Sequence, residues 1–202
     1  VQWLSRQPRP TLDRMLETGI SSPMASSCGR LFDAAAAAIG LCREHARFEA
    51  EGAMRLEAVV DHDALNADAA YSFDISTDPS SRMLRLEPLP MWRALLDDLA
   101  ADATPSLMAA RFHQGLADAV VQTVMRCIDE RAQHGERISQ VALTGGCFQN
   151  AVLLERVSAG LAQEGLEVLT HGRVPTNDGG LALGQAAIAA ARLTKSNERR
   201  AV

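Results

Sequence analysis

The sequence lacks the residue patterns of a self-contained metal centre. Its four cysteines form no C-x-x-C pair, and no two of its five histidines lie four residues apart. Metal sites built by one short stretch of chain use such closely spaced pairs, so we expect no complete site here. Unpaired cysteines also fit a reducing compartment, and we therefore expect a cytoplasmic protein.

Long apolar runs and a surplus of positive charge are absent as well. No run approaches the ~20 apolar residues of a membrane-spanning helix. The formal net charge is −5, whereas nucleic acids and anionic membranes attract basic protein faces. We therefore expect neither a nucleic acid nor a membrane as a partner.

Aromatic residues are scarce at 4%, although hydrophobic residues make up 47% of the 202 residues. This hydrophobic content is typical of a globular chain with a sizeable core. Alanine dominates the apolar set, and its small side chain favours closely packed helices. We expect a helix-rich α/β chain in which residues 1–25 are the tail of a preceding segment, 26–194 form one lobe and 195–202 are frayed.

Capping signals and hydrophobic periodicity divide the chain into helices and short strands. Ser27 and Gly40 bracket an alanine-rich helix, and apolar residues repeat every four positions along residues 106–134. His113 lies beside that repeat, and we interpret it as partly buried or interfacial rather than catalytic. The other predicted elements are a short helix ending at Gly19, a helix carrying the stripe Met54–Val60, a β-hairpin over 71–87, helices over 91–102 and 150–163, strands over 138–143 and 166–170, and a terminal helix from residue 181.

The stretch Val141–Asn150, VALTGGCFQN, is the most informative part of the sequence. A strand ends at Thr144, Gly145 and Gly146 make a turn, and a helix follows from about Asn150. Glycine lets the backbone approach a ligand closely, and N–H groups at a helix start attract anions. The stretch has neither the P-loop nor the Rossmann pattern, so by itself it fits either a phosphate cradle or an ordinary α/β turn.

A second glycine turn follows about 35 residues later, in the polar loop 175–180. The β-α-β spacing predicts a parallel crossover, so both turns are expected at the carboxyl ends of adjacent strands, facing one crevice. In this loop Asp178 fits either an oxygen ligand of a divalent cation or a helix cap.

Arg30 and Asp33 are the charged residues of the alanine-rich helix. One interpretation is that they are solvated or pair with each other. The other is that Asp33 accepts hydrogen bonds from a ligand hydroxyl, such as that of a ribose. The residues alone leave both interpretations open.

Four segments, in this order, resemble one known family. SSCGRLFDAAAAAIGL, FEAEGAM, LTGGCFQNAVLLE and VPTNDGGLALGQAAIAA are similar to the C-terminal lobe of HypF-type carbamoyltransferases, which mature nickel–iron hydrogenases. The resemblance covers almost the whole chain. A more distant likeness is to the ATPases that make threonylcarbamoyl adenosine in tRNA and to O-carbamoyltransferases of antibiotic biosynthesis.

The resemblance implies one lobe of the actin/sugar-kinase/Hsp70-like (ASKHA) fold, with a parallel βαβ core and extra helices. It implies a cleft for ATP, AMP or carbamoyl adenylate, in which Asp33 meets the ribose. It also implies a HypE-like acceptor protein whose C-terminal cysteine receives the carbamoyl group. Gly145, Gly146 and Asn150 resemble the nucleotide loop, and Asp178, with Asn177 beside it, resembles the acidic position that binds a divalent metal (Mg²⁺, iron or Zn²⁺).

The sequence departs from the family pattern in two respects. Where the family commonly has Tyr-Glu-Gly-Gln-Ala-Ala-Met, this chain has Ala50 at the glycine position, and its Cβ narrows the approach of a nucleotide. The histidine pair that holds the metal in the family's other lobe is also absent. We therefore expect weak nucleotide binding, a requirement for a missing N-terminal lobe, and self-association through the surface which that lobe would cover.

Two alternative functions and two cysteines complete the predictions. The chain can instead be a non-catalytic remnant or assembly module, or a lobe of a sugar-kinase-type phosphotransferase, although no catalytic aspartate of such a kinase can be assigned. Cys147 lies in the glycine turn, where the resembling families often have a small or apolar residue. We interpret Cys147, and also Cys28, as packing residues rather than nucleophiles.

Overall fold

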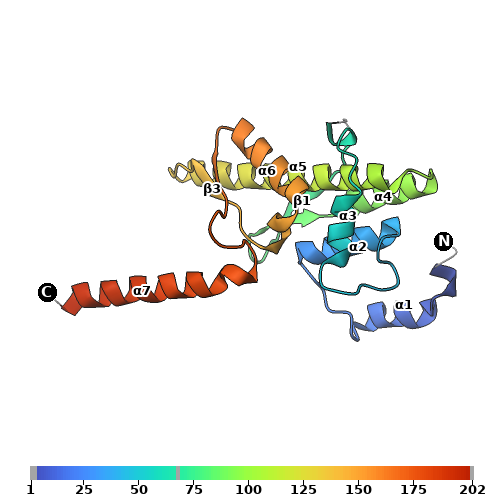
Figure 1. Cartoon of the computed structure of the whole chain (residues 1–202), viewed down its shortest axis with the longest axis horizontal. Helices are drawn as coiled ribbons and strands as arrows, with labels where there is room; N and C mark the ends of the chain where they lie inside the picture. Colours follow the sequence, from blue (N-terminus) through green and yellow to red (C-terminus); the bar gives the residue numbers. More distant parts are fainter. Residues whose placement is uncertain (1–3, 67–68, 201–202) are drawn as a thin grey trace.

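One long helix organises the part of the chain that the structure, a computed structural model, describes: residues 4–66 and 69–200. Helix α5 (Pro105–Gln133) runs through the centre of Figure 1, with α6 (Ala151–Gln163) packed along it. Helix α2 (Cys28–Ile39) packs on both α5 and α3 (Glu51–Ala58). The remaining elements are η1 (Leu4–Arg6), α1 (Arg9–Thr18), η2 (Ala64–Asn66), β1 (Asp74–Thr77), β2 (Leu84–Glu87), α4 (Leu89–Ala100), β3 (Gln140–Ala142), η3 (Gly146–Gln149), β4 (Glu167–Leu169), η4 (Asp178–Gly180) and α7 (Leu181–Arg200), where η denotes a 3-10 helix.

Local capping fixes the ends of the main helices. At the start of α2 the Ser27 hydroxyl accepts a hydrogen bond from the Arg30 N–H, and Gly40 ends the helix in a left-handed conformation. Thr104 caps α5 in the same way, and Pro105 occupies its first turn, where its missing N–H costs nothing. These ends confirm the predicted bounds of α2 and α5 to within a residue or two.

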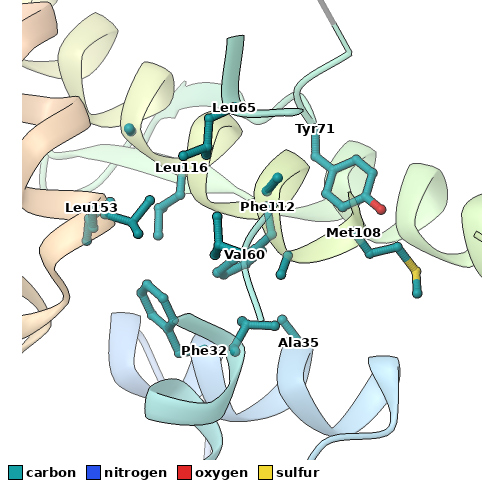
Figure 2. Packing of buried hydrophobic residues seen from close by; sticks show 14 of the residues in the cluster. Phe32, Ala35, Val60, Leu65, Tyr71, Met108, Phe112, Leu116 and Leu153 are labelled. Atoms are coloured by element: carbon teal, nitrogen blue, oxygen red, sulfur yellow. The ribbon is translucent and has the colours of Figure 1, made fainter. Parts of the chain in front are cut away.

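The core lies where α2, α5 and α6 meet. In Figure 2 the labelled side chains Phe32, Phe112, Leu116 and Leu153 come from these three helices and point toward one another. Phe32 and Phe112 pack edge to face with ring centroids 5.1 Å apart, and Ala35 and the alanine after it bring the backbone of α2 close to its neighbours. Burying each large apolar side chain contributes about 1.5–3 kcal/mol, so this junction is the main source of stability.

Two separate pairs of strands accompany the helices. β1 and β2 form the predicted antiparallel hairpin, with Ile75 opposite Leu86. β3 and β4 are parallel, with Val141 opposite Val168, and α6 connects them. The predicted parallel βαβ unit is therefore confirmed, although each of its strands is shorter than the apolar run that predicted it.

Helix α7 extends away from the rest of the molecule, toward the C-terminal end marked in Figure 1. All of its described side chains, residues 181–194, are exposed, including Leu183 and Leu193. The helix continues to Arg200, so residues 195–200 are helical where a frayed end was predicted; positions 201 and 202 of that tail lie outside the described residues. Within the described ranges, no helix combines the length and apolarity of a bilayer span.

Candidate functional site

Two loops leave the carboxyl ends of β3 and β4, as predicted, and are hydrogen-bonded to each other. We call them the glycine loop (144–149) and the proline loop (170–180). The N–H of Gly145 donates to the carbonyl of Thr176 at 2.9 Å, and the Thr176 hydroxyl donates back to the Gly145 carbonyl at 3.1 Å. His171 and Thr144 are also hydrogen-bonded, at 3.0 Å. Parallel pairing of two short strands thus brings both glycine turns to one edge.

A cavity of about 250 Å³ lies between the two loops. Ligand pockets usually enclose roughly 300–1,000 Å³, so this cavity is small for a complete nucleotide site. A larger cavity of about 340 Å³ lies between the hairpin and α5, but no residue of either loop lines it. The smaller cavity is lined by Leu143, Phe148, Gln149, Leu154, Thr170, His171, Val174, Pro175 and Thr176.

Asn150, predicted to bind nucleotide, has its side chain engaged within the protein. It is only 8% exposed, and its Oδ1 accepts the Leu153 N–H at 2.8 Å, which caps α6. Its Nδ2 donates to His113 Nε2 at 2.9 Å. Asn150 therefore fixes the exit of the glycine loop into α6, and any role toward a nucleotide stays a prediction.

His113 is fully buried, more deeply than the sequence suggested, because the rings of Phe32 and Phe112 surround it. Its Nδ1 faces the carbonyl of Ala109 at 2.7 Å. A carbonyl only accepts, so Nδ1 carries the proton and Nε2 is left to accept from Asn150. Burial lowers the pKa of His113 to about 4, against the opposing effect of the Ala109 hydrogen bond. The imidazole is therefore neutral at physiological pH.

A carboxylate of the protein already accepts a hydrogen bond at the N-terminus of α6. Glu57, at the end of α3, accepts the Ala151 N–H at 2.6 Å. Together with the Asn150 cap, this leaves fewer free donors at the α6 terminus than the sequence suggested. The N–H groups of Gly146 and Cys147 are the first two of η3, so no acceptor within that helix is available to them. The backbone donors available to an anion are therefore those of the glycine loop rather than those of α6.

The sequence left two roles open for Asp178, a helix cap and an oxygen ligand of a cation. In the structure the neighbouring Asn177 is the cap, since its Oδ1 accepts the Gly179 N–H at 3.0 Å. The Asp178 carboxylate is exposed and makes no hydrogen bond or ion pair with residues that the structure describes. Among these residues no three His, Cys, Asp or Glu side chains gather to hold a metal. Asp178 fits a divalent cation as a single oxygen ligand, and the described chain does not build a complete site.

Asp33 forms an ion pair with Arg30, with Oδ2 3.2 Å from Nη1. The interpretation that Arg30 and Asp33 pair with each other is therefore confirmed. About a third of the Asp33 side chain stays exposed, so contact with a ligand hydroxyl stays a prediction. Gly52 of α3 lies beside this carboxylate, because a Cβ added there would be 3.4 Å from Asp33 Oδ1.

Ala50 occupies a conformation that favours glycine. Its φ of 62° and ψ of 14° place it in the left-handed region immediately before α3. The next residue, Glu51, is 2% exposed and accepts hydrogen bonds from Arg47 and Arg55, which hold the turn. These bonds, chiefly those from Arg47, lower the pKa of Glu51 to about 2. Glycine would adopt this left-handed conformation without the penalty that alanine pays, which is a backbone reason for glycine at this position that does not involve a ligand.

Replacing Ala50 by glycine is expected to raise the free energy of unfolding by about 0.5–1 kcal/mol, because glycine escapes the left-handed penalty. Urea denaturation measures this change. The control is Ala132→Gly, an exposed position in the last turn of α5, which should lose up to about 1 kcal/mol. A loss of stability in both variants would contradict the backbone explanation.

Comparison with known proteins then identifies the family. Residues 2–185 match the family described as carbamoyltransferase, Kae1-like domain, second subdomain. The chain belongs to the HypF carbamoyltransferase family. It is 40% identical over 186 residues to the carbamoyltransferase HypF of Rhodobacter capsulatus, covering 92% of this chain and 22% of that protein. A HypF homolog of Cupriavidus necator is 37% identical over 198 residues, covering 95% of this chain and 47% of the homolog.

Solved HypF structures share the fold. A crystal structure of full-length HypF in a phosphate- and nucleotide-bound form superposes with a TM-score of 0.79 at 31% identity, over 92% of this chain and 23% of that one. HypF of T. kodakarensis has a TM-score of 0.69 at 23% identity, over 94% of this chain and 23% of that one. The chain thus spans between a fifth and a half of the HypF proteins named here.

Proposed function

We propose that this chain is the nucleotide-binding lobe of a HypF-like carbamoyltransferase and one half of an ASKHA-type cleft. In this proposal the lobe holds ATP, AMP or carbamoyl adenylate. The carbamoyl group then passes to the C-terminal cysteine of a HypE-like acceptor during nickel–iron hydrogenase maturation in the cytoplasm. Transfer requires a second lobe, so the chain alone binds nucleotide weakly and transfers nothing.

The pairing of the two loops is the observation that carries this proposal. Gly145 and Thr176 join the glycine and proline loops across a cavity of about 250 Å³. A cavity of this volume has room for part of a nucleotide, and one wall of an interlobe cleft would need to hold only such a part. A HypF protein with the same fold was crystallised with phosphate and nucleotide bound. The exposed apolar side chains of α7 also fit a lobe that packs against further protein, either the second lobe or a second copy.

Carbamoyl transfer from carbamoyl adenylate does not require a nucleophilic side chain of this chain. Carbamoyl adenylate is a mixed anhydride that is already activated, so the protein has to hold it, polarise its carbonyl and admit a thiolate. The N–H groups of Gly146 and Cys147 are fixed donors suited to a phosphate or a developing oxyanion. His113 and Asn150 hold the loop that presents these donors, because both side chains are bonded to each other beneath it.

Replacing Gly145 by alanine is expected to weaken binding of a fluorescent ATP analogue by at least tenfold. Gly145 has φ 107° and ψ 155°, a region essentially closed to other residues, so a side chain costs about 1–3 kcal/mol or moves the loop. The matched control is Gly165→Ala, which also has a positive φ and open space for a Cβ. It lies between α6 and β4, at the opposite end of β4 from the loops, and should change affinity less than twofold. Equal affinities in all three proteins would refute the nucleotide-lobe proposal.

Asp178 tests the metal part of the proposal and separates an enzyme lobe from a remnant. A bound divalent cation would supply Lewis acidity toward phosphate oxygens, and Asp178 would contribute one carboxylate ligand. In a protein that carries both lobes, Asp178→Ala should abolish metal-dependent carbamoyl transfer. Asp118→Ala, on α5, is a control that should keep it. Full transfer by the Asp178 variant would instead favour a lobe that acts only in assembly.

A further inference from the structure

One titratable side chain lies in the wall of the cavity between the glycine and proline loops. Among the residues that line this cavity, His171 is the one with an acid–base side chain, and the others are apolar or neutral polar residues. The imidazole is exposed, so a group that enters the cavity from solvent can reach it. Histidine is the residue type that most often transfers protons in active sites.

Parallel pairing of β3 and β4 holds this imidazole at the edge of the cavity. The Leu143 N–H donates to the Leu169 carbonyl at 2.9 Å, which extends the strand pairing to the residue before the glycine loop. Thr144 follows directly, and its Oγ1 lies 3.0 Å from Nε2 of His171. The ring is therefore anchored at one nitrogen to the loop that leaves the neighbouring strand.

The Thr144 hydroxyl leaves the second ring nitrogen of His171 available. A hydroxyl accepts as well as donates, so Oγ1 can accept from a protonated Nε2 while Nδ1 keeps its lone pair. Within the ranges that the structure describes, Nδ1 makes no hydrogen bond. When Nδ1 takes up a proton, Nε2 continues to donate to Oγ1. The ring can therefore accept a proton without turning.

His113, which is bonded to the residue that ends the glycine loop, is not suited to this task. It is fully buried, and its two nitrogens are engaged by the Ala109 carbonyl and the Asn150 amide. Burial also lowers its pKa to about 4, which makes it a weak proton acceptor at neutral pH. Of these two histidines, His171 is the one that is both exposed and placed in the cavity wall.

A thiol acceptor needs a base because most of it is protonated at neutral pH. The ordinary pKa of a thiol is about 8.5, so only a few per cent is thiolate, and the thiolate is the nucleophile. Imidazole is well matched to remove such a proton, and a positioned general base typically accelerates a reaction by about 10²–10⁴-fold.

We propose that His171 is the general base of carbamoyl transfer and that Thr144 is the positioning residue that holds its ring. Nδ1 accepts the proton of the acceptor's cysteine thiol, and the thiolate attacks the carbamoyl carbon of carbamoyl adenylate. The bond between that carbon and the phosphate oxygen breaks, AMP leaves with the electron pair, and His171 releases its proton to water. One thiol and one carbamoyl adenylate thus give a thiocarbamate, AMP and one proton. This inference rests on the function proposed above.

An acceptor that needs no base separates this role from a structural one. A protein that carries both lobes is given carbamoyl adenylate and a HypE-like acceptor that ends in cysteine or in selenocysteine, whose selenol is already ionised at neutral pH. In single turnovers His171→Gln should slow transfer to the cysteine acceptor by about 100-fold or more and transfer to the selenocysteine acceptor by less than about threefold. Retained transfer to selenocysteine also shows that the variant is folded and binds its substrates.

Two further positions sharpen the test. Thr144→Val keeps the shape of the side chain but removes the hydroxyl, and it should slow transfer to cysteine by about five- to tenfold, whereas Thr144→Ser should restore it. The matched control is His134→Gln, which changes an exposed histidine between α5 and the start of β3, at the end of that strand opposite Thr144. This control should leave the transfer rates to both acceptors unchanged.

The outcomes distinguish the base from the proposed function. Equal losses with the two acceptors, or an unchanged rate with cysteine, would overturn the role of His171 while carbamoyl transfer by the unchanged protein still supports the proposed function. Absence of transfer by the unchanged two-lobe protein would overturn the proposed function itself, and the inference with it.

Discussion

Replacing Gly115 by alanine is expected to lower the free energy of unfolding by about 3 kcal/mol or more, a large share of the 5–15 kcal/mol typical of a domain. Gly115 lies in α5 directly against the backbone of Tyr71. A Cβ at this position would be 1.9 Å from the Tyr71 carbonyl oxygen and 2.8 Å from its carbon. Backbone atoms cannot rotate away as a flexible side chain can, so the chain segment at Tyr71 or the helix must move.

Movement of Tyr71 would disrupt a polar cluster as well. Its N–H donates to the Arg111 carbonyl, and its hydroxyl donates to Asp98 at 2.6 Å. Asp98 is also paired with the Arg111 guanidinium. Burial opposes ionisation of Asp98, but hydrogen bonds from Arg111 and Tyr71 hold its pKa below the usual range. The collision therefore costs hydrogen bonds in addition to packing.

Urea denaturation of Gly115→Ala measures the effect, with Gly184→Ala as the matched control. Gly184 is also in a helix, but a Cβ there meets nothing within 4 Å. The control should be neutral or stabilised by up to about 1 kcal/mol, since alanine is the better helix former. A Gly115 variant within 0.5 kcal/mol of the unchanged protein would show that the contact relaxes freely.

Acidification from pH 6.5 to about 4 is expected to cost up to about 3 kcal/mol of stability through His113 alone. The histidine has a pKa near 6.5 when unfolded and about 4 when buried in the native protein. Between these values the unfolded chain binds a proton that the native state does not. The contribution of the neutral histidine is therefore complete above pH 6.5 and is lost as the pH falls toward 4.

Histidine NMR and acid denaturation test this directly. The imidazole signal of His113 should not titrate above pH 5. His113→Gln should flatten the stability slope between pH 6.5 and about 5.3, a range in which ordinary carboxylates, with pKa values near 4, titrate little. A normal titration of His113 near pH 6.5 would rule out the buried neutral imidazole.

Protonation of His113 would also affect the candidate site, because His113 is hydrogen-bonded to Asn150 at the end of the glycine loop. Protonated His113 carries hydrogens on both ring nitrogens, so Nε2 would face the donor Nδ2 of Asn150 instead of accepting from it. Loss of that bond loosens the residue that caps α6 and ends the glycine loop. Any nucleotide affinity of the loop should therefore decline over the same pH range as the stability.

Local sequence patterns were enough to predict the main helices and strands and their order. Caps such as Ser27 and Thr104, the alternation in 71–87 and the β-α-β spacing are signals between residues a few positions apart, and such signals act before the chain folds. They predicted both glycine turns at one edge of a parallel pair, which the structure shows. The four motifs also pointed to the HypF family, which the comparisons confirm.

The contacts of the site residues follow from tertiary packing and could not be predicted from local patterns. Glu57 reaches the N–H of Ala151, 94 residues away, and Asn150 meets His113 across 37 residues. No local pattern encodes such pairs, because they depend on how three helices pack around Phe32 and Phe112. Periodicity fixes which face of a helix is apolar, whereas packing fixes the partner that the face meets.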